Sequence, residues 1–119
     1  MNNIEFLRAN GVDIENSVNT LGLDLYNETL NVFLSEIVDK TNKLKECLMA
    51  NNMKDYATYV HAIKGECSYL GFTELTKQAL DHQLKSQAGD AEYIRNNYVT
   101  LLTEIGRVIK VARIYLGLE

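Results

Sequence analysis

The 119-residue sequence contains no proline and no tryptophan, and it has only two cysteines and two histidines. Proline is the residue that most disfavours a helix interior, so its absence leaves long helices uninterrupted. No apolar run approaches the roughly 20 residues that span a bilayer, and residues 1–6 lack the basic and apolar regions of a signal peptide. We therefore expect a cytoplasmic protein without a membrane segment.

The charge balance and the cysteines argue against further classes of function. The 12 Lys and Arg residues are outnumbered by 16 Asp and Glu residues, which gives a net charge of −4. With no basic stripe along the chain, nucleic acid is not expected as a partner. Cys67 falls on an apolar helical stripe, and Cys47 is the only other thiol. We expect free, buried thiols rather than a disulfide or a metal pair.

Apolar residues recur throughout the chain at helical spacing, which predicts an all-α domain. Two short helices are expected first, the second of them capped by Asp13, and four long amphipathic helices follow. The predicted ranges are about 3–9, 13–21, 24–50, 53–70, 72–87 and 91–116. Four long helices joined by short turns predict an up-down-up-down four-helix bundle after a short N-terminal helical segment. Residues 1–119 are expected to form one domain.

His61 lies beside the apolar stripe of the predicted helix 53–70, not within it. Residues three and four apart share a helix face, so one small, polar surface surrounds this histidine. That surface comprises Ala57, Thr58, Lys64, Gly65 and Ser68. Glycine inside a helix costs roughly 1 kcal/mol relative to alanine. Gly65 therefore indicates that a partner must approach the imidazole closely.

A single histidine on a helix is most often a solvated surface residue or a hydrogen-bonded core residue, so the interpretation of His61 depends on its neighbours. Lys64 can neutralise an anion attached to the imidazole, and it disfavours a proton on the free ring. A neutral imidazole is a nucleophile, which suits temporary storage of a phosphoryl group on a ring nitrogen. No carboxylate pair lies beside His61 to hold Mg²⁺, so the catalytic groups are expected from a partner.

A spaced run of residues resembles the signature of histidine-containing phosphotransfer (HPt) domains of bacterial two-component phosphorelays. The run is His61-x-x-Lys64-Gly65-x-x-Ser68-x-x-Gly71, and Gly11-Val12-Asp13-Ile14 resembles the family's N-terminal segment. The resemblance implies that His61 is the phosphorylated residue and that Lys64 neutralises the phosphoryl oxygens. It also implies that Gly65 leaves room for a receiver domain, whose aspartate and bound Mg²⁺ perform the transfer. On this basis the chain itself binds no cofactor and no metal.

The partner-docking surface is expected to include Ala57, Thr58, Gly65 and Ser68, together with apolar residues of the 24–50 helix. Five residues depart from the family's pattern, namely Glu66, Cys67, Tyr69, His82 and Gln83. We expect the first to add a negative charge near the docking face and Tyr69 to point away from His61. His82 lacks a neighbouring lysine–glycine pair, so it is interpreted as a partly buried structural residue rather than a second phosphorylation site.

The leading hypothesis is a phosphorelay carrier that accepts a phosphoryl group on His61 from a receiver aspartate or a sensor kinase, and passes it to another receiver. The alternative is a helical adaptor that binds a receiver without phosphotransfer. An enzyme with its own active site is less favoured, since the sequence has no glycine-rich nucleotide loop, metal cluster or catalytic triad. We expect a monomer, because no second apolar stripe is apparent.

Overall fold

The computed structural model describes residues 3–119, which form six helices. The helices are α1 (Ile4–Ala9), α2 (Ile14–Leu21), α3 (Leu23–Met49), α4 (Met53–Leu70), α5 (Thr73–Gln87) and α6 (Ala91–Tyr115). They fall where the sequence predicts them, with ends that differ by at most one residue. The prediction of an all-α bundle is confirmed.

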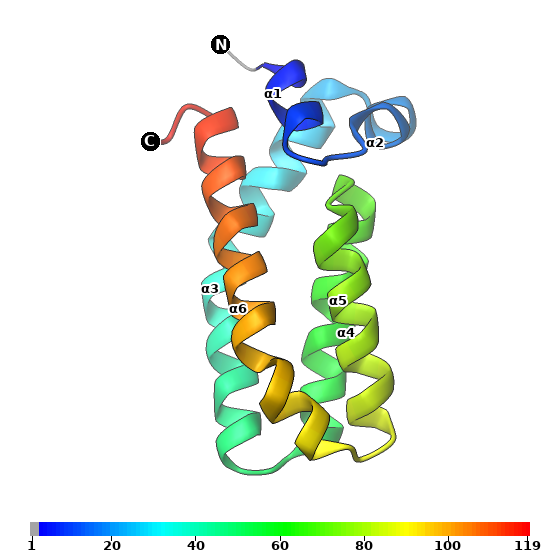
Figure 1. Ribbon diagram of the computed structural model, residues 1–119. Helices are drawn as coiled ribbons and strands as arrows, with labels where there is room; N and C mark the ends of the chain where they lie inside the picture. Colours follow the sequence, from blue (N-terminus) through cyan, green and yellow to red (C-terminus); the bar gives the residue numbers. More distant parts are fainter. Residues whose placement is uncertain (1–2) are drawn as a thin grey trace.

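The four long helices pack around one another in chain order (Figure 1). Helix α4 contacts α3 and α5, and α6 closes the bundle by packing against α5 and α3. Helices α4 and α6 therefore lie diagonally across the bundle. The short helices α1 and α2 lie at one end, where both ends of the described chain are also found (Figure 1).

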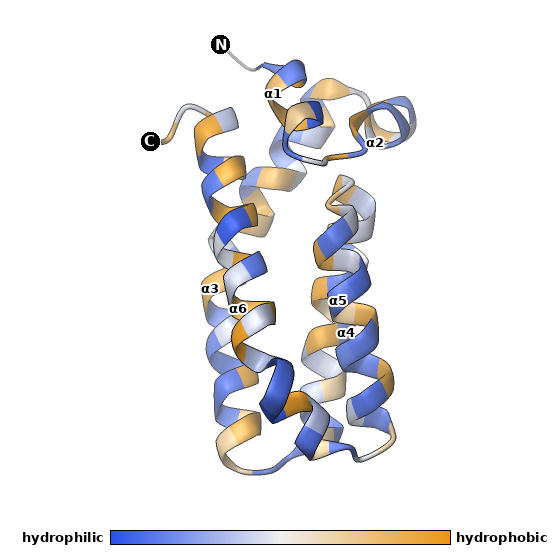
Figure 2. Cartoon of the chain, in the orientation of Figure 1, coloured by the Kyte–Doolittle hydropathy of each residue, from blue (hydrophilic) through white to orange (hydrophobic). Residues whose placement is uncertain are grey.

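Hydrophobic residues recur along each of the long helices (Figure 2), and their buried side chains form one shared core. Among the largest fully buried side chains are Tyr26, Phe33, Tyr56 and Phe72. The Phe33 and Phe72 rings stack with centroids 6.2 Å apart. The Tyr26 hydroxyl donates a hydrogen bond of 2.7 Å to the Leu70 carbonyl oxygen. This bond ties the end of α4 to α3 and satisfies a polar group that would otherwise be buried alone.

The prediction of free, buried thiols is confirmed for Cys47 and Cys67. Burial raises the pKa of both thiols, which keeps them protonated and unreactive. His82 is more deeply buried than expected, at 2% exposure. Its Nδ1 atom lies 2.8 Å from the Tyr56 hydroxyl, and its ring packs between those of Tyr56 and Tyr93. A buried hydrogen-bond partner makes this burial tolerable, and the role of His82 is structural.

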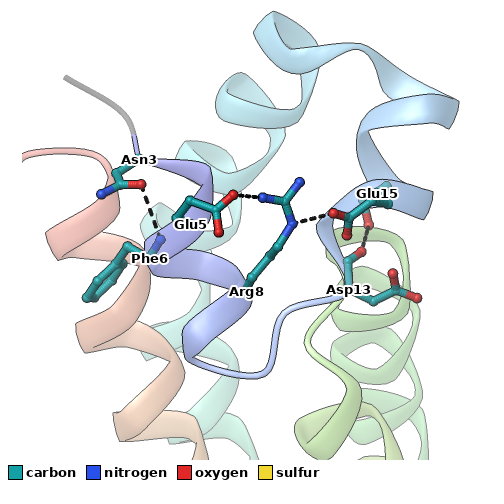
Figure 3. A network of polar contacts seen from close by, with 7 residues as sticks. Asn3, Glu5, Phe6, Arg8, Asp13 and Glu15 are labelled. Atoms are coloured by element: carbon teal, nitrogen blue, oxygen red, sulfur yellow. Dashed lines mark hydrogen bonds and ion pairs between the residues drawn. The ribbon is translucent and has the colours of Figure 1, made fainter.

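The two short helices are joined at the surface by Arg8 of α1 (Figure 3). Its guanidinium pairs with Glu5 in the same helix and with Glu15 in α2. The Asn3 side chain accepts a hydrogen bond from the Phe6 amide and caps the start of α1. Exposed ion pairs of this kind each contribute about 0–1 kcal/mol, so the position of α2 depends mainly on other contacts.

The stronger connection is made where the α1–α2 linker packs on the end of α4. Gly71 ends α4 with φ of 86°, in the left-handed region that favours glycine. The Asp13 amide donates a hydrogen bond of 2.8 Å to the Gly71 carbonyl oxygen. A Cβ atom on Gly71 would lie 2.6 Å from the Asp13 carbonyl oxygen. Both the backbone conformation and the close approach require glycine here, and the contact holds α2 beside α4.

Candidate functional site

Helix α4 presents His61 to solvent because its opposite face is fixed in the core. The fully buried side chains Tyr56, Val60, Ile63 and Cys67 follow the three- and four-residue spacing of one helix face. The first turn is capped by the Asn52 side chain, which accepts a hydrogen bond from the Asp55 amide. A helix held along its whole length gives the exposed imidazole a defined position.

The orientation of the His61 ring is set by a residue of α5. Its Nδ1 atom lies 2.9 Å from the Oε1 atom of Gln83. An amide oxygen only accepts hydrogen bonds, so the neutral tautomer that fits this contact has its proton on Nδ1 and its lone pair on Nε2. Sequence reasoning noted Gln83 only as a departure from a pattern. Its role was missed because the two residues are 22 positions apart and meet only when α4 and α5 pack.

Two cavities border His61, one on each side. The α4–α5 groove has a volume of about 660 Å³, and its lining includes Lys54, Ala57, Thr58 and Gln83. The α2–α4 hollow has a volume of about 450 Å³, and its lining includes Asn16, Thr20, Lys64, Gly65, Ser68 and Tyr69. The structure therefore divides the predicted site residues between two cavities that meet at His61. Ala57 lines the groove but is buried, at 7% exposure, so it offers a partner little surface.

Two expectations about this surface need correction. Tyr69 does not point away from His61: it is half exposed and lines the α2–α4 hollow, because eight residues return it to within a quarter turn of His61. Glu66 does not add free charge to the docking face, since its carboxylate pairs with Lys40 of α3. The cavities at His61 are bordered by α2 and α5, and the contribution of apolar α3 residues to docking stays a prediction.

Gly65 lies beside open space, and nothing within the chain requires a glycine at this position. A Cβ atom there would meet no atom within 4 Å, and the backbone is helical. Neither packing nor conformation within the chain requires glycine, although it weakens the helix by roughly 1 kcal/mol. The effect of Gly65 is to leave the surface open beside the exposed His61 imidazole and the half-buried Lys64.

Two classes of site are not found among residues 3–119. This part of the chain places no three His, Cys, Asp or Glu side chains where they could jointly hold a metal ion. None of its helices combines the length and the apolar character needed to cross a membrane.

An all-α bundle that exposes one oriented imidazole beside a lysine has the features of a protein that carries a phosphoryl group. Comparison with protein families finds a match to the Hpt domain over residues 28–109, a segment that includes His61, Lys64, Gly65 and Gln83. The match covers more than half of the chain, and the chain belongs to the Hpt domain family. This family performs histidine phosphotransfer in two-component signalling. Searches of curated proteins and of solved structures find no match.

Proposed function

We propose that this chain is a phosphorelay carrier. His61 accepts a phosphoryl group from the aspartate of a receiver domain, or from a sensor kinase, and passes it to the aspartate of another receiver. The observation that carries the proposal is the hydrogen bond from His61 Nδ1 to Gln83 Oε1. It leaves Nε2 as the nitrogen with the lone pair, on an exposed part of α4.

The transfer needs little covalent chemistry from this chain. The Nε2 lone pair attacks phosphorus, and the N–P bond forms as the P–O bond to the partner's aspartate breaks. The bonding electrons leave with that carboxylate, which stays on the partner. The proton stays on Nδ1, where it is hydrogen-bonded to Gln83 Oε1. This hydrogen bond stabilises the positive charge that develops on the ring. Lys64 offsets the charge of the phosphoryl oxygens, and Mg²⁺ is expected on the partner's carboxylates.

The alternative function is a receiver-binding adaptor that transfers no phosphoryl group. It would use the same surface around His61, but it would not need an outward nitrogen with a defined lone pair. The ring orientation set by Gln83 therefore favours the carrier. Two buried free thiols suit a reducing compartment, so we place this exchange in the cytoplasm, with the carrier acting as a monomer.

The test is phosphotransfer from a panel of labelled phospho-receivers to the wild type, to His61→Gln and to His82→Gln. Label should appear on the wild type and on His82→Gln, and should be absent from His61→Gln. The product should be labile in acid and stable in alkali, as a phosphohistidine is. Receivers that bind both wild type and His61→Gln without labelling either would establish the adaptor instead.

Lys64 can be tested separately from His61. We expect Lys64→Ala to slow transfer by about ten- to a hundredfold, or to shorten the lifetime of the phosphohistidine, because one charge-assisted contact is worth about 1.5–3 kcal/mol. The thermal unfolding midpoint should change little. Lys45→Ala removes an exposed lysine from α3 and serves as the control. Equal transfer rates in the two variants would show that Lys64 is only a surface residue.

A further inference from the structure

The surface around His61 differs in charge from the rest of the chain. The residues lining the α4–α5 groove and the α2–α4 hollow include two lysines, Lys54 and Lys64, and no Asp or Glu. The whole sequence has 16 acidic residues against 12 basic ones. Asp13 is found only in the next depression, beyond Ser68. The cationic, carboxylate-free surface is therefore local to the histidine.

Lys54 lies on the same face of α4 as His61, seven residues earlier. Seven residues are almost two helical turns, or about 10 Å along the axis, whereas Lys64 lies one turn beyond His61. Lys54 is exposed, and within residues 3–119 neither lysine forms an ion pair with a carboxylate. The neighbouring Asp55 is hydrogen-bonded to Asn52 and acts on Cys47 of α3. Asp55 is not among the residues that line the groove.

We propose that Lys54 is a second docking cation of this surface, which attracts an acidic phosphotransfer centre on the partner. The proposal rests on the proposed function. A phosphoryl donor presents phosphoryl oxygens together with the carboxylates that hold its metal ion, so its approaching face is negative. Positive charge placed on both sides of His61 steers that face towards the imidazole. Lys54 is about 10 Å from His61 along the helix, so it acts on encounter and not on the bond that forms.

The experiment compares Lys54→Gln and Lys54→Glu with Lys110→Gln and Lys110→Glu. Lys110 is exposed on α6, which lies diagonally across the bundle from α4. The same substitution at Lys54 and at Lys110 changes the net charge by the same amount. The measured quantity is the second-order rate constant of transfer from a phospho-receiver that labels the wild type, as a function of salt. At low salt we expect a loss of about threefold for Lys54→Gln and about tenfold for Lys54→Glu. The differences should largely disappear near 0.5 M salt, while the Lys110 variants stay near the wild type.

A second measurement uses phosphoramidate, a small donor that needs no protein docking. Its P–N bond breaks as the N–P bond to His61 forms, and ammonia leaves. All four variants should be labelled within about twofold of the wild-type rate, because only long-range charge differs. Slow labelling of the Lys54 variants by phosphoramidate would place the residue in the chemistry and overturn the proposal.

The remaining outcomes distinguish failure of the Lys54 docking role from failure of the phosphorelay function. Equal losses in the Lys54 and Lys110 variants would show that net charge matters and Lys54 does not, which refutes the proposal alone. Equal rates in all variants and the wild type would do the same. If no phospho-receiver labels the wild type, the proposed function fails, and the docking role of Lys54 fails with it.

Discussion

Replacing Gly71 with alanine tests whether the end of α4 determines the position of α2. The left-handed conformation at φ of 86° disfavours any residue with a Cβ atom, by roughly 1–2 kcal/mol. The new Cβ would also lie 2.6 Å from the Asp13 carbonyl oxygen, which is backbone and cannot rotate away. The linker must therefore shift, and the hydrogen bond from the Asp13 amide to the Gly71 carbonyl is lost or lengthened.

The size of the effect follows from these two contributions. The conformational cost and a lost hydrogen bond of about 1 kcal/mol together predict a destabilisation of about 2–3 kcal/mol. For a domain of this size the unfolding midpoint should fall by about 10 °C. Movement of the linker should also displace α2, whose residues Asn16 and Thr20 line the hollow beside His61. Phosphotransfer should therefore slow even at temperatures where the variant is folded.

Gly89→Ala is the matched control for this prediction. Gly89 follows α5 with φ of 74°, and a Cβ there would meet nothing within 4 Å. The two glycines share a capping arrangement, since the next residue's amide bonds to the carbonyl five residues back in each case. Gly89→Ala should cost only the conformational part, roughly 1–2 kcal/mol. Equal unfolding midpoints by thermal circular dichroism in the two variants would refute the close-approach argument at Gly71.

Three further predictions concern the site and the core. Gly65→Gln should stabilise α4 slightly yet slow transfer at least tenfold by obstructing the partner, whereas Gly106→Gln, at another helical glycine beside open space, should leave transfer unchanged. Gln83→Glu keeps an acceptor for Nδ1 and should retain more transfer activity than Gln83→Leu, which frees the ring; equal rates would refute the orienting role. Burial lowers the pKa of His82, so the unfolded chain binds the proton more readily. Urea unfolding should therefore show stability that is full above pH 7 and declines below about pH 6.5, by up to about 1.4 kcal/mol per pH unit, with a flatter profile for His82→Gln.

The helices could be predicted closely because their signals are local. Apolar residues at three- and four-residue spacing and the glycines that end helices act over one or two turns. Asp13 stands at the predicted first position before α2, but its side chain makes no capping hydrogen bond. The same locality placed Lys64, Gly65 and Ser68 on one face with His61. Each of these inferences needed only the geometry of a single helix.

What the sequence could not supply is the pairing of side chains on different helices. The contact between His61 and Gln83 and the pair formed by Lys40 and Glu66 each join residues more than 20 positions apart. They depend on how α4 rotates against α5 and α3, which periodicity leaves free by tens of degrees. For that reason the charge of Glu66 was assigned to the wrong side of α4.

Gly65 and Gly71 belong to one sequence motif, but glycine is present at the two positions for different physical reasons. Gly71 is required by its own chain, because its φ is positive and the Asp13 backbone lies against it. Gly65 is helical and borders open space, so nothing in its own chain requires the absence of a side chain. Gly106 is also helical and beside open space, so it is the position of Gly65 next to the exposed His61 that indicates a constraint from a partner. Gly71 is therefore needed for the fold, and we expect Gly65 to be needed for access of the partner to His61. Their substitutions should therefore separate stability from phosphotransfer.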